Sequence, residues 1–466
     1  MNNEELRRNK YRRKKAMLRK VQNKMGVAFF VIILVLFALA VRILLINYNH
    51  GEAYSKTVLD HQSYTSTTIP YKRGQIQDAN GTVLAYSERV YNLILDPKLI
   101  LSDEKYKEPT LTALTECFDL KRSDLESILA TKSTSQYEKL LKELTKDEIS
   151  EFESRVEDTK NNPYIKGVWF EDSYIRKYPF STLAADVIGF ASAANGGELG
   201  LENYYDEELS GTDGISYSYV GENLDVETQE KKAEDGYNLV TTIDYKVQSI
   251  IENKIKELNA ERPSKSTAVI AMNPKTGEIL AMASYPTFNL NNPRDLSGVY
   301  TQEELSTMTD IEMTNAMYAL WSNYCVSTIY EPGSTFKPFT VAEGLEEGVI
   351  HDGDTFYCGG FMEVSGSIIN CHEHSGHGTV TVKEGLIQSC NPTMMQIAAK
   401  LGGVKIAKYE ALFGFGNRTG IDLPGEEAGL TIGEKMTVID AACNSFGQNI
   451  NVNMVQMAAA FSSLVN

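Results

Sequence analysis

A long apolar run close to the N-terminus constrains this chain more than any other feature of its sequence. Residues 25–46 contain a single charged side chain, Arg42, and are long enough to cross the hydrocarbon core of a bilayer as one helix. Arg42 lies about one turn from the end of the run, where its guanidinium can reach the interface. The alternatives are a cleaved signal peptide, since Ala38-Leu39-Ala40 is similar to a cleavage site, and a buried core helix.

The residues before this run favour an uncleaved membrane anchor. Ten lysines and arginines precede it, against two glutamates, so this head has a net charge of +8. The rest of the chain has a net charge of −25, which gives −17 for the whole chain. A buried helix does not explain these cations, and the run exceeds the roughly 7–15 apolar residues of a signal peptide. Because basic residues stay on the cytoplasmic side, we expect a cytoplasmic head (1–24), an anchor (25–47) and an extracytoplasmic body in the cell membrane.

The charge and the cysteines of the body exclude some classes of protein. Its acidity argues against nucleic acid as a partner. Six cysteines are too few to make disulfides the framework of the fold. Cys358 and Cys371 flank a strand-like segment, residues 361–370, and a hairpin there leaves open either a disulfide or two free thiols.

Histidines near these cysteines raise the question of a metal. His372, His374 and His377 follow Cys371 closely, and imidazole and thiolate are the ligands that zinc prefers. Their spacing fits no structural zinc template. We therefore predict loop histidines, no metal site and no cofactor.

The body divides into two predicted domains, residues 48–236 and 237–466. In the first, residues 73–85 predict a hairpin with a type I′ turn at Asn80-Gly81, and residues 103–160 predict solvated helices. In the second, residues 267–283 predict two apolar strands joined by a turn. Residues 285–330 are polar and read as an irregular loop that borders a site, and helical patterns follow.

Ser334 and Lys337 form the first candidate catalytic pair. They stand three residues apart where a helix is predicted to begin, with Gly333 before them and Pro338 in the first turn. At that spacing both side chains share one face. A desolvated lysine with a lowered pKa can take the proton of a serine, and the helix N-terminus offers N–H groups to developing negative charge. Taken alone, the pair is equally an N-cap serine with a surface lysine.

Ser389-Cys390-Asn391 supplies a second candidate motif. A hydroxyl there can relay a proton to a leaving group, and the amide can hold a substrate peptide. Its alternative is a plain helix-ending turn, which the following Pro392 favours. In this order and spacing, the two motifs together indicate an active serine site more strongly than either alone.

With these motifs in place, the chain resembles the class B penicillin-binding proteins, single-pass D,D-transpeptidases that cross-link bacterial peptidoglycan. The resemblance covers nearly the whole chain. Its matching blocks are Arg73-Gly74, Asp78, Asn80-Gly81, Arg176–Pro179, Gly200–Glu202, Leu209–Gly211, Asn273–Ser284, Tyr330–Lys337, His377-Gly378, Ser389–Asn391 and Ser445–Gln448. Ala79 and Tyr324 stand where the family often has arginine, which puts local contacts in doubt.

The resemblance implies both a fold and a set of roles. The fold is α+β: one transmembrane helix, an elongated β-rich pedestal or dimerisation domain, and a transpeptidase domain similar to serine β-lactamases. Ser334 is implied as the acylated nucleophile and Lys337 as its general base, with Ser389 and Asn391 as the second element. The implied partners are peptidoglycan stem peptides, β-lactams, the membrane and a cell-wall glycosyltransferase.

The third motif of that family, K-T-G, is expected after Ser445–Gln448, and the chain stops at Asn466 without it. Lys275-Thr276-Gly277 precedes Ser334 and reads as a hairpin turn instead. We therefore expect a transpeptidase domain without its C-terminal strands. The alternatives to an enzyme are an inert structural partner of a glycosyltransferase and a β-lactam sensor or β-lactamase. No glycosyltransferase motif is recognisable in residues 48–236.

Overall fold

The computed structural model describes residues 34, 37–39, 41–42, 65–192, 196–220 and 226–466. The predicted cytoplasmic head and most of the predicted anchor lie outside these residues. Within the described part of the chain, no helix combines the length and the hydropathy that a membrane crossing needs. The chain divides into two compact units, Met1–Ile69 with Gly214–Lys232, and Pro70–Asp213 with Ala233–Asn466.

The described part of the first unit contains a three-stranded antiparallel sheet in the order β1-β8-β9. Its strands are β1 (Thr65–Ile69), β8 (Gly214–Val220) and β9 (Val226–Lys231).

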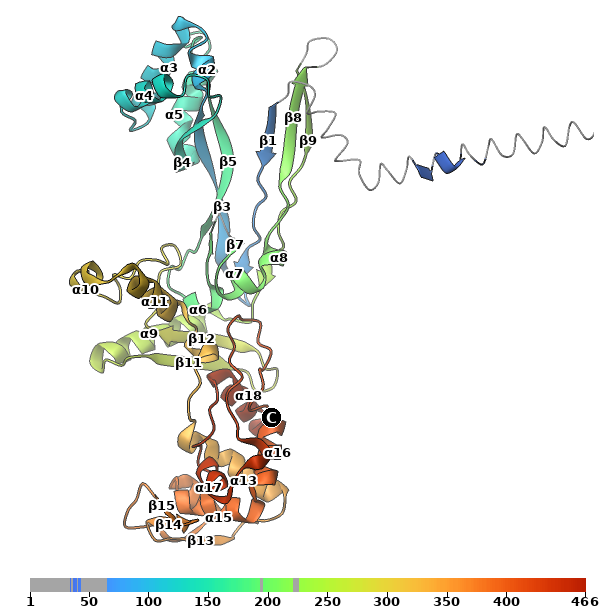
Figure 1. Cartoon of the computed structure of the whole chain (residues 1–466), viewed down its shortest axis with the longest axis vertical. Helices are drawn as coiled ribbons and strands as arrows, with labels where there is room; N and C mark the ends of the chain where they lie inside the picture. Colours follow the sequence, from blue (N-terminus) through green and yellow to red (C-terminus); the bar gives the residue numbers. More distant parts are fainter. Residues whose placement is uncertain (1–33, 35–36, 40, 43–64, 193–195, 221–225) are drawn as a thin grey trace, which may run out of the picture. The chain divides into compact units, whose positions relative to one another are not determined.

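A five-stranded sheet organises the N-terminal part of the second unit. Its path is β10-β2-β3-β4, and β5 also pairs with β3. The strands are β2 (Ile76–Gln77), β3 (Val83–Leu95), β4 (Glu138–Leu144), β5 (Val168–Lys177) and β10 (Leu239–Val240). β3 and β5 run antiparallel from the pair Tyr86 and Lys177 to the pair Leu95 and Val168, which makes a long ribbon (Figure 1).

The predicted hairpin at the start of this sheet is present, but its turn is of another kind. One carboxylate oxygen of Asp78 accepts hydrogen bonds from the backbone N–H groups of Asn80 (2.9 Å) and Thr82 (2.7 Å). Gly81 has a φ of +86°, whereas Asn80 has no positive φ. A type I′ turn needs positive φ at both residues, so that prediction was wrong.

Four helices lie around the far end of the ribbon: α2 (Pro97–Ile100), α3 (Glu104–Cys117), α4 (Arg122–Thr131) and α5 (Lys146–Glu157). Leu111, Phe118 and Phe152 pack with Leu93 of β3 into one core. The predicted helices between residues 103 and 160 are thus present, but β4 lies among them and was missed.

The pedestal motifs that the sequence analysis singled out meet in one buried ion network. Glu202 has a fully buried side chain and binds two guanidinium groups, through Arg73 Nε (2.7 Å) and Arg176 Nε (2.6 Å). Tyr178 donates its hydroxyl to the same carboxylate (3.1 Å). The short elements around it are α6 (Ala185–Ile188), β6 (Ala191–Ser192), β7 (Gly196–Gly197), α7 (Gly200–Tyr204) and α8 (Asp206–Leu209).

The hairpin predicted for residues 267–283 is present as β11 (Thr267–Met272) and β12 (Ile279–Tyr285). Helix α9 (Tyr245–Glu261) packs against β12, where the buried amide of Gln248 both donates to and accepts from the backbone of Met282. Lys275-Thr276-Gly277 lies in the exposed turn between the two strands, as predicted.

The segment predicted to be an irregular loop, residues 285–330, contains three helices. These are α10 (Gln302–Thr307), α11 (Asp310–Trp321) and α12 (Tyr324–Ser327). The first two begin with capping boxes, Thr301 with Glu304 and Thr309 with Glu312, which satisfy the N–H groups of the first turn. The prediction of an irregular loop was wrong because these capping boxes stabilise helices whose apolar periodicity is too weak to indicate them.

The remaining elements form a largely helical region that carries both candidate motifs. The helices are η1 (Gly333–Phe336), α13 (Lys337–Glu346), α14 (Val382–Ile387), α15 (Asn391–Leu401), α16 (Gly403–Leu412), η2 (Gly433–Lys435), α17 (Val438–Asn444) and α18 (Met454–Val465). The strands are β13 (Thr355–Cys358), β14 (Phe361–Val364), β15 (Ser367–Asn370) and β16 (Gly378–Thr381). Phe336, Phe339 and Phe415 anchor the start of α13 in a buried aromatic cluster.

Candidate active site

Ser334 lies on the tight 3₁₀ turn η1, and Lys337 is the first residue of α13. In a 3₁₀ turn residues three apart eclipse, so both side chains leave the same side of the backbone. Ser334 is exposed and its hydroxyl makes no hydrogen bond to another described residue. Lys337, in contrast, is 1% exposed. The turn therefore carries an exposed hydroxyl at Ser334 and, three residues on, a buried amine at Lys337.

The ammonium group of Lys337 binds the second motif. Its Nζ donates to the backbone carbonyl oxygen of Ser389 (2.5 Å), to the hydroxyl of Ser389 (2.8 Å) and to Oδ1 of Asn391 (2.8 Å). The structure thus brings Lys337, Ser389 and Asn391 together across more than fifty residues of sequence.

Burial changes the acid–base properties of this amine. Desolvation lowers the pKa of Lys337 from 10.5 to about 8, and the thiols of Cys371 and Cys390 oppose part of that effect. A lysine of ordinary pKa is almost fully protonated at neutral pH. Lys337 instead holds an accessible fraction of neutral amine, which is what a general base needs.

The second motif sits in a strained turn between α14 and α15. Ser389 has a φ of +51°, a conformation that non-glycine residues seldom adopt. Cys390 is the N-cap of α15, and its backbone N–H donates to the carbonyl of Gly385 (2.8 Å). Asn391 donates its Nδ2 to the carbonyl of Asn370 (3.1 Å). These contacts hold the amide and the hydroxyl toward Lys337.

A third segment, Ser445–Gln448, supports the serine turn from behind. The N–H of Gly333 donates to the carbonyl of Gly447 (2.9 Å), and Oγ1 of Thr340 donates to the carbonyl of Ser445 (2.9 Å). Gly447 has a φ of +82°, and a Cβ there would lie 2.1 Å from the carbonyl oxygen of Gly333. The position therefore requires glycine.

Sequence reasoning did not identify Asn370 as part of this site. Residues 361–370 were read as strand-like, but nothing in the sequence indicates which side chain the carbonyl at the end of that segment would meet. His377, which the resemblance included, lies before β16 and faces the cysteines instead.

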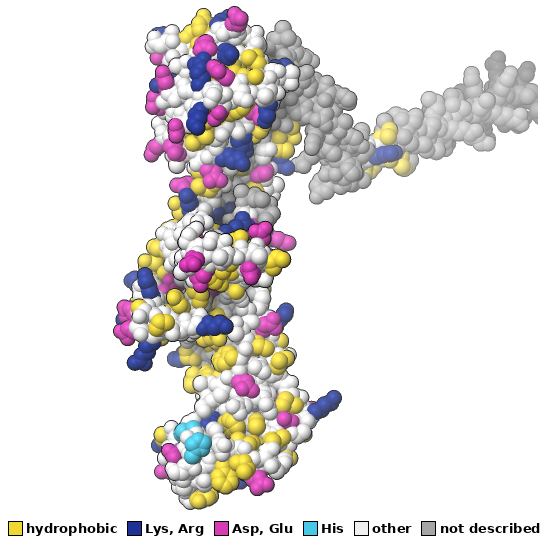
Figure 2. All heavy atoms as spheres, turned by 60° about the vertical axis from the view of Figure 1, so that its left-hand side comes forward, with side chains coloured by type: hydrophobic (Ala, Val, Ile, Leu, Met, Phe, Trp, Pro, Cys, Tyr) yellow, Lys and Arg dark blue, Asp and Glu magenta, His cyan; other side chains and the backbone are white. Residues whose placement is uncertain are grey.

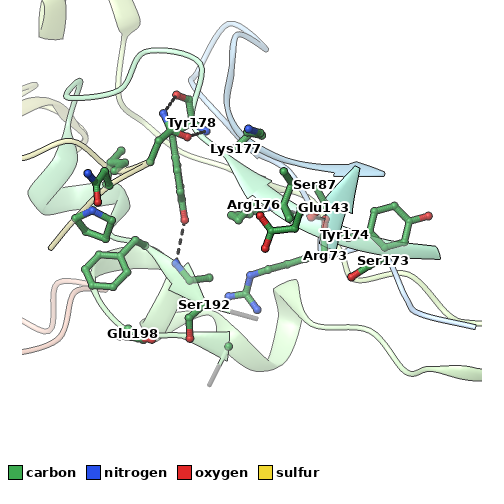
Figure 3. Close-up of a pocket in the computed structure, with 18 of the residues that line it drawn as sticks. Arg73, Ser87, Glu143, Ser173, Tyr174, Arg176, Lys177, Tyr178, Ser192 and Glu198 are labelled. Carbon is green, nitrogen blue, oxygen red and sulfur yellow. Dashed lines mark hydrogen bonds between the residues drawn. The ribbon is translucent and has the colours of Figure 1, made fainter. Parts of the chain in front are cut away.

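A cavity of about 610 Å³ lies elsewhere, beside the buried ion network. Arg73, Arg176 and Tyr178 help to line it, and the Tyr178 hydroxyl accepts a hydrogen bond from Ala191 N–H (2.9 Å; Figure 3). None of the four predicted catalytic residues lines this cavity.

Two families of known domains match this chain. Residues 68–241 match the family described as "Penicillin-binding Protein dimerisation domain", and residues 267–466 match "Penicillin binding protein transpeptidase domain". Both occur here in one chain and in that order. The chain belongs to the class B penicillin-binding proteins.

Curated relatives agree with this membership. Stage V sporulation protein D of Bacillus subtilis is 32% identical over 413 residues, covering 86% of this chain and 59% of the relative. Peptidoglycan D,D-transpeptidase MrdA of Acinetobacter baumannii is 26% identical over 423 residues, with the same two shares. The chain thus spans 59% of the length of each of these two class B proteins.

Solved structures show the same fold. Penicillin Binding Protein 2X from Streptococcus thermophilus superposes with a TM-score of 0.70 at 25% identity, covering 86% of this chain and 59% of the other. The penicillin-binding protein PBP2 in a complex with MreC from Helicobacter pylori gives 0.65 at 21% identity, covering 85% and 76%. The mixed helical and stranded architecture of the described residues is therefore that of class B penicillin-binding proteins.

Proposed function

We propose that this protein is a peptidoglycan D,D-transpeptidase that forms an acyl-enzyme on Ser334. The observation that carries the proposal is the contact of the buried Lys337 amine with both Ser389 and Asn391, three residues along the chain from an exposed serine. A buried amine with a pKa of about 8 and an adjacent relay hydroxyl is suited to acyl transfer.

In the first step the Ser334 oxygen attacks the carbonyl carbon between the two terminal D-alanines of a stem peptide. Its proton passes to the neutral amine of Lys337, and the leaving D-alanine nitrogen receives a proton through the Ser389 hydroxyl. In the second step an acceptor amine attacks the ester, and the new amide bond releases Ser334 with its proton restored. The amide of Asn391 would hold the substrate backbone.

The geometry sets one condition on this mechanism. An ammonium group has three N–H donors, and all three have acceptors in the second motif. Lys337 must therefore exchange one of these contacts for the Ser334 hydroxyl when substrate binds. Catalytic hydrogen bonds commonly tighten only in the substrate complex.

The direct test is release of D-alanine from a pentapeptide that ends in D-Ala-D-Ala, with and without an acceptor amine. We expect release that depends on Ser334 and a cross-linked product when the acceptor is present. An inert structural subunit would release none. A β-lactamase would instead hydrolyse penicillin with turnover and leave the pentapeptide intact.

We also propose that the protein is anchored in the cell membrane by residues 25–47, with its body outside the cytoplasm, and that a membrane glycosyltransferase is a partner. The support is the basic head before the apolar run and the match of residues 68–241 to a dimerisation domain. Protease added outside spheroplasts should digest the body and spare the head. Protection of the body would contradict this orientation.

A further inference from the structure

Four potential metal ligands converge beside the second motif from four separate places in the fold. Cys358 ends β13, Cys371 follows β15, His377 precedes β16, and Cys390 is the N-cap of α15. Their ligand atoms all lie within 4.8 Å of one another. The three cysteines are at most 1% exposed and carry free thiols.

The distances suit a tetrahedral zinc ion. Zinc–sulfur bonds of about 2.3 Å and zinc–nitrogen bonds of about 2.0–2.1 Å at tetrahedral angles place sulfur and nitrogen roughly 3.6 Å apart. Nδ1 of His377 lies 3.5 Å from the sulfur of Cys358 and 3.6 Å from that of Cys371. One imidazole nitrogen thus faces two thiols at the separation that a shared ion imposes.

The surrounding backbone is folded tightly around these groups. The backbone N–H of Cys371 donates to the carbonyl oxygen of Gly360 (2.8 Å), which joins the segments that carry two of the four ligands. Gly376 has a φ of +82°, and a Cβ there would lie 2.4 Å from the carbonyl oxygen of Cys358. The loop that carries His377 is therefore held against the end of β13.

The strands that hold the ligands are only partly supported by the core, in which Phe356 of β13 and Val364 of β14 are buried. Among the described residues β13 pairs with β16 alone and β14 with β15 alone, so both sheets are two-stranded. Tyr357, Phe361 and Ile368 are exposed on them. Figure 2 shows histidine side chains at the surface at this end of the second unit. Two-stranded sheets of this size are marginal alone, and a metal commonly supplies the missing stability.

We propose that Cys358, Cys371, His377 and Cys390 bind one zinc ion in a closed tetrahedral site. The three thiols bind as thiolates, and their protons go to solvent. Three sulfurs and one imidazole form a ligand set typical of structural zinc. The sequence analysis did not consider Cys390 as a fourth ligand because this residue lies within the serine motif. The site does not depend on the proposed transpeptidase activity.

Metal analysis of the full chain, purified in detergent without chelators, tests the proposal. We expect about one zinc per chain. Cys358→Ser and His377→Ala should each weaken zinc affinity by more than about 100-fold, beyond the loss that an outer-shell change causes. Cys443→Ser and His374→Ala, which alter a thiol and an imidazole outside the cluster, are the matched controls and should keep the metal.

A second measurement uses the unmodified chain, so its result does not depend on whether the variants fold. Zinc is removed from the unmodified chain and cobalt(II) alone is added, which should give thiolate-to-cobalt charge-transfer bands and the intense visible bands of a tetrahedral site. The proposal is overturned if the purified chain holds no zinc and shows no such spectrum. A disulfide between Cys358 and Cys371 in non-reduced peptides, or equal metal loss in the controls, would overturn it as well.

Discussion

Lys337 is the residue on which the proposed chemistry depends most. Its side chain is buried, its pKa is lowered by desolvation, and its amine contacts a hydroxyl and an amide of the second motif. A surface lysine three residues after a serine would share none of these properties. Burial is therefore what separates a catalytic pair from an N-cap serine with a nearby cation.

The lowered pKa of Lys337 predicts the pH dependence of acylation by penicillin. The neutral amine is the reactive form, so the rate should rise about tenfold per pH unit below the pKa and level off above about 8. Lys337→Arg, which cannot lose its proton, should be slower by roughly 10²–10⁴-fold on the plateau above pH 8 and should lack this pH dependence. Stopped-flow acylation across this range measures both. A flat profile in the unmodified chain would assign the base elsewhere.

Glu343, on the same helix, is a second buried titratable residue. Neither of its carboxylate oxygens has a partner among the described residues. Burial first, and the nearby Glu410 second, raise its pKa from 4.5 to about 9. The folded state thus keeps a proton that the unfolded chain releases above 4.5. The contribution of the protonated Glu343 to the free energy of unfolding is therefore complete below pH 4.5 and is lost as the pH rises toward 9.

Glu343→Gln should remove this dependence. We expect the variant to gain about 1–3 kcal/mol in free energy of unfolding near pH 8 and to change little near pH 5, where the wild-type residue is neutral. Denaturant titration at the two pH values measures this. Glu346→Gln, on an exposed turn of α13, is the control and should show no such difference. An equal gain at both pH values would mean that Glu343 is not protonated in the folded state.

At the scale of elements, the ion network at Glu202 holds together segments that are distant in sequence. Arg73 precedes β2, Arg176 lies in β5 and Glu202 lies in α7, and the two arginine side chains are at most 9% exposed where they meet the fully buried carboxylate. This contact accounts for the charged residues that the three motifs carry. Each motif supplies one part of a network that no single element could satisfy.

Glu202→Ala should therefore be strongly destabilising, because it leaves the buried Arg176 guanidinium without its carboxylate partner and Arg73 with the carboxylate of Asp206 alone. We expect a loss of about 3–5 kcal/mol in free energy of unfolding. Asp172→Ala removes the exposed ion pair with Arg89 on the same sheet and should cost at most about 1 kcal/mol. Similar losses of free energy of unfolding in the two variants would show that the buried network stabilises the fold no more than an exposed ion pair does.

Prediction from the sequence succeeded where a local pattern determines the structure. The β11–β12 hairpin and the turn before α13 follow from apolar alternation, glycine and proline. Helices α10 and α11 were missed although Thr301 and Glu304 form a readable capping box. β4 was missed because its lysines and glutamates suggested a solvated helix, whereas it pairs with β3 only through long-range register. Tertiary packing places Cys390 beside Cys358 and Cys371, and the spacing of these residues in the sequence does not indicate that contact.

At the scale of the whole molecule, the candidate site is an assembly of three segments. Ser334 and Lys337 come from one, Ser389 and Asn391 from the next, and Ser445–Gln448 closes the turn from behind. Matches to a dimerisation domain and to a transpeptidase domain lie on the same chain. The proposed activity therefore depends on whether this assembly makes Ser334 reactive.

Peptide mapping after treatment with penicillin tests that claim most directly. We expect one covalent adduct per chain, carried by the peptide that contains Ser334 and absent from Ser334→Ala. Ser322→Ala, which removes another serine hydroxyl outside the site, should label normally. No adduct on the folded, unmodified chain, or an adduct that persists in Ser334→Ala, would show that Ser334 is not the acylated nucleophile.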